Sequence, residues 1–183
     1  MIAMLSACAD GTRTPDSCDY KELVSVPTET IKMYKIIIHK DVPSNRVGLI
    51  LDAAYEWVVA TSGAVTFETT YSNFDISATP LDGEILVYEG PQTDGSSIGL
   101  DWSWKGQDNG HPTKSRIWIL KDLEPRLYYL TAMHEFGHAI GLPHVDNSKG
   151  PAIMIPTCTD VGDHPTCVDR NNACALWGCD PGC

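Results

Sequence analysis

The chain has 183 residues, of which 43% are hydrophobic and 20% charged, so it is long enough for one globular domain with a buried core. Its 24 acidic and 13 basic residues give a formal net charge of −11, which disfavours nucleic acid and anionic membrane surfaces as partners. No run of 18 or more apolar residues occurs, so no membrane-spanning helix is expected.

Residues 1–30 are expected to form a leader or linker arm, because residues 9–30 are polar and rich in Thr, Ser, Asp and Pro. Residues 5–8, Leu-Ser-Ala-Cys, resemble the lipobox at which bacterial lipoprotein precursors are cut and lipidated on cysteine. However, no basic residue precedes Cys8, whereas a signal peptide has a charged start and a longer apolar stretch. Secretion and lipid anchoring through Cys8 therefore both stay open.

Seven elements are predicted between residues 33 and 141, in the order β-α-β-β-β-β-α. The expected strands are 33–39, 64–70, 84–89, 98–104 and 115–120. The first long helix runs from about Val47 to Ser62-Gly63, and the second runs from about Arg126 to Gly141. Asp41, Pro43 and Ser44 are expected to supply a turn and a possible cap before the first helix. This order predicts an α+β fold in which the first long helix packs on a sheet.

The segment 98–104 alternates only weakly between apolar and polar residues and is predicted to be an exposed edge strand. Asp94, Gly95 and Asp101 lie in a Gly/Ser-rich stretch that could hold a calcium ion through oxygen ligands, although no EF-hand pattern is present. The alternative is that the acidity of the chain serves solubility alone.

Residues 134–144 read HEFGHAIGLPH, which is the pattern H-E-x-x-H-x-x-G-x-x-H, able to hold a catalytic zinc ion. Such a string arises by chance in roughly one chain of this length in a hundred thousand. His134 and His138 are four residues apart, so their imidazoles share one helix face and can reach one metal ion. Gly141 can adopt the left-handed conformation that ends the helix, and His144 then returns as a third ligand.

Glu135 lies about 100° further round the helix, where it can touch a water bound to the ion but not the ion itself. Three neutral imidazoles leave a tetrahedral zinc ion one open position, which distinguishes a catalytic site from a closed structural one. The other histidines, His39, His111 and His164, are scattered and are expected to be ordinary surface or core residues.

Five of the seven cysteines lie within residues 158–183, which predicts disulfides in the tail and an extracytoplasmic location. No C-x-x-C pair occurs, which disfavours a zinc ribbon or a redox motif. If Cys8 is set aside, the five tail cysteines cannot all pair among themselves, so Cys18 is expected to bond to the tail. The alternative is that Cys18 caps the zinc ion as a thiolate in a latent form.

The zinc motif makes the chain resemble the metzincins, a family of zinc-dependent endopeptidases, over roughly residues 33–178. The resemblance implies an α+β fold with a five-stranded mixed twisted sheet and one catalytic zinc ion. It also assigns roles to residues of the motif and to Met154. These are His134, His138 and His144 as zinc ligands, Glu135 as general base, Gly141 as the pivot between two subdomains, and Met154 as the methionine of the family's Met-turn.

The order of elements is similar to that of the matrixin branch, whose closing helix ends in an aromatic–Gly pair like Trp177-Gly178 here. The resemblance implies a catalytic domain over 31–183, with an upper subdomain 31–141 and an irregular, disulfide-rich lower subdomain 142–183 that contains a final helix. Pro156 stands where astacin-like and serralysin-like enzymes carry a tyrosine, and the matrixin cysteine-switch sequence is absent around Cys18.

We therefore expect a monomeric, secreted or lipid-anchored zinc metalloendopeptidase that binds an extended peptide beside strand 98–104. The segment 155–160, with Ile155 and Pro156, is expected to form an apolar wall of the main specificity pocket. One alternative is a non-catalytic zinc-binding or adhesion module derived from a protease, although such a module would not need Glu135. Another is a zinc hydrolase that acts on a non-peptide amide.

Overall fold

The core of the protein is one five-stranded sheet, seen in a computed structural model that describes residues 31–92, 97–105, 111–156 and 162–183. The strands are β1 (Lys32–His39), β2 (Val65–Ser72), β3 (Glu84–Gly90), β4 (Gly99–Lys105) and β5 (Pro112–Leu120). They lie in the order β2-β1-β3-β5-β4, and only β4 runs antiparallel to its neighbour. The sheet is therefore mixed, and the strand predicted at 98–104 lies at its edge.

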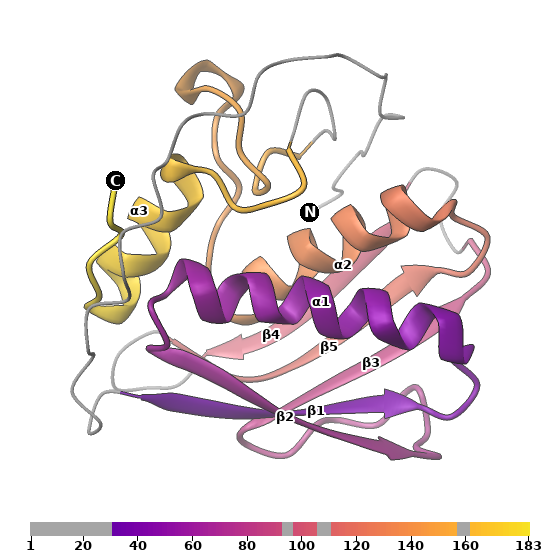
Figure 1. Cartoon of the computed structure of the whole chain (residues 1–183). Helices are drawn as coiled ribbons and strands as arrows, with labels where there is room; N and C mark the ends of the chain where they lie inside the picture. The colour runs from indigo at the N-terminus through magenta and orange to yellow at the C-terminus, as the bar shows by residue number, and fades with distance from the viewer. Residues whose placement is uncertain (1–30, 93–96, 106–110, 157–161) are drawn as a thin grey trace.

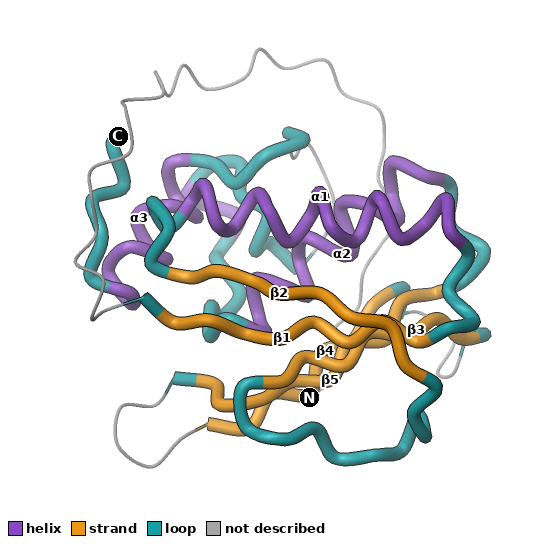
Figure 2. Tube along the Cα trace, turned by 60° about the horizontal axis from the view of Figure 1, so that its bottom comes forward, coloured by secondary structure: helices purple, strands orange, loops and turns teal. Residues whose placement is uncertain are grey.

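The middle of the sheet is apolar on both faces, because both faces are covered. Residues 36–38 of β1 are all buried, as the uninterrupted Ile run predicts. Helices cover one face, while the connection 73–83 runs along the other (Figure 2). On that second face the ring of Phe74 packs edge-on against His39, with the ring centroids 4.9 Å apart.

Two long helices, α1 (Ser44–Ala60) and α2 (Pro125–Ala139), lie side by side over the same face of the sheet (Figure 1). Trp57 of α1 is fully buried, and its indole nitrogen donates a hydrogen bond to the carbonyl of Met133 in α2 at 2.8 Å. This bond satisfies the only polar atom of the ring inside the core. It also fixes the position of α1 relative to α2 along their common direction.

The chain beyond α2 is mostly irregular until α3 (Cys167–Trp177), with the short 3-10 helix η2 (Asn147–Lys149) between them. A capping box of Thr166 and Asp169 starts α3, and Gly178 ends it in the left-handed conformation, with φ of 71°. The final helix predicted in the tail is therefore confirmed.

The tail holds disulfides, as predicted from its dense cysteines. Cys174 and Cys179 are bonded to each other across the end of α3, and Cys167 is disulfide-bonded as well. The Sγ atom of Cys174 lies 3.6 Å from the carbonyl oxygen of Ala60, so this bond lies where α3 meets α1. Cys8 and Cys18 lie outside the described residues.

The order of elements matches the predicted one, and the boundaries differ by at most about three residues. β5 begins at Pro112 instead of residue 115, and the hydroxyl of Tyr34 donates to the Pro112 carbonyl at 2.6 Å. Of the residues expected to supply a turn and a possible cap for α1, Pro43 is the N-cap residue, and no side chain forms a capping hydrogen bond. Within the described part of the chain, no helix has the length and apolar character needed to cross a membrane.

Candidate metal centre and active-site cleft

The α2 helix carries the first two histidines of the zinc motif. The Glu124 side chain accepts hydrogen bonds from the backbone amides of Arg126 and Leu127, and Pro125 occupies the first turn, so the helix starts where the sequence predicts. Ten residues further on, the four-residue spacing of His134 and His138 brings their Nε2 atoms to 3.1 Å from each other.

The third histidine is delivered by the turn after α2. Gly141 has φ of 104°, and its amide donates to the carbonyl of His138 at 2.8 Å, which closes the helix. An added Cβ at Gly141 would lie 2.9 Å from Pro112 and 3.0 Å from Leu176, so a larger residue would not fit there even without the backbone strain. The turn then leads to His144, whose Nε2 lies 3.2 Å from that of His134 and 3.1 Å from that of His138.

This arrangement of nitrogens fits a zinc ion. Zn–N bonds of about 2.0–2.1 Å in a tetrahedron separate the ligand nitrogens by about 3.3 Å, close to the 3.1–3.2 Å between the three Nε2 atoms. Among the described residues, His134, His138 and His144 form the one group of three or more metal-capable side chains that lie this close together.

Hydrogen bonds at the far side of two rings fix their orientation and tautomer. Nδ1 of His134 lies 2.7 Å from the carbonyl oxygen of Ile153, and Nδ1 of His138 lies 2.8 Å from that of Leu142. A carbonyl only accepts, so each Nδ1 carries the proton and each Nε2 presents a lone pair to the centre of the cluster.

Burial keeps these rings uncharged. Desolvation lowers the pKa of His134 to about 3 and that of His138 to about 4, and it also lowers the pKa of His144. At neutral pH the Nε2 lone pairs of His134 and His138 therefore face each other with no proton between them. A bound cation is the chemical complement of such a cluster.

Glu135 is buried beside the histidine cluster of His134, His138 and His144, against the edge strand β4. An added Cβ at Gly99 would come within 2.6 Å of its Oε1 atom, so only glycine leaves room for the carboxyl group. Burial raises the pKa of Glu135 well above its usual range, and the nearby Asp101 carboxyl raises it further.

Met154 lies in the turn that follows η2, next to the residue whose carbonyl contacts His134. Val145, next to the third histidine, donates from its amide to the carbonyl of Met154 at 2.9 Å. The buried Asp169 carboxylate of α3 accepts hydrogen bonds from the amides of Ile153 and Met154, at 2.8 and 3.1 Å. Sequence reasoning missed this role of Asp169, for which the only signal was the capping pattern Thr166-x-x-Asp169.

A cleft of about 600 Å³ opens beside the histidines. Its lining comes from β4, from the second half of α2, from the turn that carries the third histidine, and from Pro112 and Pro156. Pro156 thus lines the cleft as predicted. Ile155 does not, because it is buried in the hydrophobic core. The rest of the expected wall, residues 157–161, lies outside the described residues.

The other three histidines are not part of the histidine cluster. His39 lies 3.6 Å from Asp41, His111 stacks on Trp177, and His164 pairs with Glu56 at 2.9 Å. Of the candidate calcium ligands, Asp94 and Gly95 lie outside the described residues, and Asp101 accepts hydrogen bonds from serine hydroxyls. The calcium site stays a prediction.

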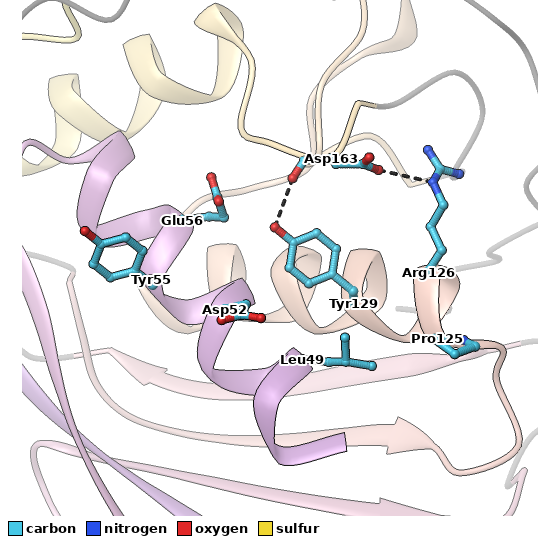
Figure 3. A pocket seen from close by; sticks show the side chains of 8 residues that line it. All are labelled: Leu49, Asp52, Tyr55, Glu56, Pro125, Arg126, Tyr129 and Asp163. Carbon is cyan, nitrogen blue, oxygen red and sulfur yellow. Dashed lines mark hydrogen bonds and ion pairs between the residues drawn. The ribbon is translucent and has the colours of Figure 1, made fainter. Parts of the chain in front are cut away.

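A second hollow, of about 460 Å³, lies between α1 and α2 and shares no lining residue with the cleft (Figure 3). The hydroxyl of Tyr129 donates to the carbonyl of Asp163 at 3.0 Å, and Arg126 pairs with the Asp163 carboxylate at 3.1 Å. These contacts fasten the segment before α3 to α2. No residue of the zinc motif lies in this hollow.

Comparison with known families identifies the chain. The matrixin model of peptidase family M10 matches residues 31–176. The chain belongs to the matrixin family. This matrixin is a zinc metalloendopeptidase. None of the curated proteins matches the chain closely enough to count as a relative.

Three solved structures have the same fold as the matrixin. High choriolytic enzyme 1, a hatching-enzyme zinc protease of the medaka fish Oryzias latipes, is 13% identical, with a TM-score of 0.51 over 93% of this chain and 99% of its own. The archaemetzincin of Methanopyrus kandleri is 12% identical, with a TM-score of 0.55 over 84% and 99%. Metalloproteinase-II of Bacteroides fragilis is 16% identical, with a TM-score of 0.53 over 86% and 58%. At these identities the likeness concerns the fold alone.

Proposed function

We propose that His134, His138 and His144 are the catalytic zinc ligands of this matrixin and that Glu135 is the general base in peptide-bond hydrolysis. One observation carries the proposal: three Nε2 atoms converge within 3.2 Å of one another at the wall of a cleft that also contains the Glu135 carboxyl. A site of this kind leaves one coordination position open to the cleft.

A zinc ion held there supplies the Lewis acid that polarises the scissile carbonyl and activates a water molecule for attack. The Glu135 carboxylate accepts a proton from the attacking water and then donates it to the leaving amine nitrogen. Burial alone disfavours the ionised carboxylate, but a dication in the histidine cluster acts in the opposite direction. The two effects on the pKa of Glu135 therefore oppose each other.

The substrate of the proposed reaction is an extended peptide bound along β4. This strand pairs with β5 on one side, and no other described strand lies at its outer edge. An edge of this kind offers unpaired main-chain groups that can bind another extended chain. Because β4 residues and the three histidines line the same cleft, a peptide bound to this edge would lie next to the histidine cluster.

We further propose that Met154 is the methionine of a Met-turn, since its turn supports the ring of His134 through the Ile153 carbonyl. The catalytic domain would then span 31–183, with Gly141 as the pivot between an upper part, 31–141, and a lower part, 142–183. The disulfides in the tail favour an extracytoplasmic location. Lipid attachment through Cys8 and secretion are both compatible with it.

The test compares wild type with Glu135→Gln in digests of a denatured proteome, with cleavage sites mapped by mass spectrometry and zinc content measured on the same samples. We expect both proteins to hold zinc and the variant to lose at least about 100-fold of the activity. If the variant still cleaved the proteome at a rate close to that of wild type, Glu135 would not be the general base. A wild type that bound zinc but cleaved nothing would favour the non-catalytic module.

A further inference from the structure

A second carboxyl group, that of Asp101, lies in the catalytic cleft and has no part in the proposed reaction. Alternate residues of β4 face α2 and line the cleft, namely Gly99, Asp101, Ser103 and Lys105. Gly99 adjoins Glu135, and the Ser103 hydroxyl lies 3.3 Å from the carbonyl of His138. Asp101 lies between Gly99 and Ser103 on this strand and lines the same cleft as the three histidines.

Two serines hold the Asp101 carboxylate in one orientation. The hydroxyl of Ser103 on β4 donates to one carboxylate oxygen, and that of Ser115 on the adjacent β5 donates to the other. The two serine oxygens are themselves 2.6 Å apart. Since a carboxylate oxygen can accept more than one hydrogen bond, this arrangement leaves acceptor capacity towards the cleft.

No basic side chain of the described residues forms an ion pair with Asp101. Of the 13 lysines and arginines in the chain, only Arg13 and Lys21 lie outside the described residues. Burial raises the pKa of Asp101 to about 7, although the two serine hydroxyls act against this. A partly buried carboxylate without a cation is costly unless something else compensates its charge.

We propose that Asp101 is a specificity-determining residue that selects substrates with a lysine or arginine at one of the two positions flanking the cleaved bond. The inference rests on the proposed function, because it needs a peptide bound along β4. The ammonium or guanidinium group of the substrate would donate to the fixed carboxylate and supply the missing cation. Its arrival also favours the ionised form of Asp101.

The size of the effect follows from one charged hydrogen bond in a partly buried site. Such a bond contributes about 1.5–3 kcal/mol, so the preference should be about 10- to 100-fold in kcat/KM. The probes are two synthetic peptides that are identical except for Lys or Met at the selected position. That position is read beforehand from the sites at which wild type cuts a denatured proteome.

Wild type should cut the Lys peptide about 10- to 100-fold better, and Asp101→Asn should reduce this ratio to about threefold or less. The matched control is Asp82→Asn, which removes a carboxylate exposed outside the cleft and should leave the ratio unchanged. Ser115→Ala keeps the Asp101 charge but removes one of the two hydrogen bonds that orient the carboxylate, so the preference for lysine should fall without being lost. If Asp101→Asn does not fold, this partial fall is the test, and an unchanged preference would contradict the inference.

Several results would overturn the inference. Wild type that cleaves proteins without any preference for basic residues refutes it while the proposed function stands. So does an Asp101→Asn variant that keeps the preference but binds zinc more weakly in a chelator competition, because Asp101 would then balance the metal charge. If wild type binds no zinc and cleaves nothing, the proposed function fails and this inference fails with it.

Discussion

Gly137 and Met154 are packed so closely that no side chain fits between them. A Cβ added to Gly137 would lie 2.2 Å from the sulfur of Met154 and 2.9 Å from the Trp57 ring. Gly137 is one of the unspecified positions of the zinc motif. At this position α2 packs closely against Trp57 of α1 and against the turn that contains Met154. The contact explains why a helix interior contains a residue that favours helix poorly.

The Gly137→Ala variant should therefore be less stable, although alanine is the better helix former. Overpacking of a tight core costs about 1–3 kcal/mol of unfolding free energy, which outweighs the gain in helix propensity. The matched control is Gly48→Ala in α1, where an added Cβ meets nothing within 4 Å. Urea denaturation should show that this control is more stable than wild type by up to about 1 kcal/mol. Equal stability of the two variants would contradict the packing argument.

Removal of the third imidazole should loosen the metal without unfolding the protein. His144 is the most exposed ring of the cluster, so His144→Ala should keep the circular dichroism of wild type. Zinc affinity should fall by more than about 100-fold, beyond the loss seen when only a supporting residue is changed. Competition with a chelator measures the affinity. His164→Ala is the control, since His164 pairs with Glu56 away from the cluster and its loss should leave zinc binding intact.

Stability of the metal-free protein should fall as the pH drops below about 6.5. The folded-state pKa of His134 is lowered to about 3 and that of His138 to about 4, so below pH 6.5 the unfolded chain takes up protons that the folded protein does not. The stabilising contribution is fully present above the unfolded pKa and is lost as the pH falls towards those lowered values. At pH 5 the loss for His134 alone is about 2 kcal/mol.

Urea denaturation of chelator-treated protein at pH 7.5, 6 and 5 checks this prediction. The unfolding free energy should fall less steeply with decreasing pH in His134→Gln, which lacks one of the two imidazoles with a pKa lowered to about 3 or 4. If wild type and variant lost stability in parallel, protonation of His134 would not contribute to the acid sensitivity.

The disulfide between Cys174 and Cys179 should stabilise the lower part of the molecule. It closes a short loop around the end of α3, for which chain entropy predicts about 2 kcal/mol. The double variant Cys174→Ala/Cys179→Ala should unfold at lower urea concentration by a corresponding amount. Reductant should then destabilise wild type more than the variant. Equal sensitivity would assign the effect of reductant to the disulfide of Cys167.

The sequence alone predicted the element order and most of the metal centre, because both depend on local spacing. Three isoleucines in a row indicated a strand buried on both faces, and this holds for β1. The four-residue interval between His134 and His138 fixes their angle on a helix, and the glycine at 141 indicated where the chain turns back. The relative positions of the residues in this motif therefore follow from their spacing in the sequence.

Contacts between distant segments were decided only by the tertiary structure. The Ile153 carbonyl that orients His134 comes from 19 residues away, and the serine that holds Asp101 stands on another strand, 14 residues on. Asp101 was a calcium candidate by sequence alone, and pairing of β4 with β5 beside α2 places it at the wall of the same cleft as the histidines. Periodicity describes which face a residue takes, whereas the partner it meets there depends on how the elements pack.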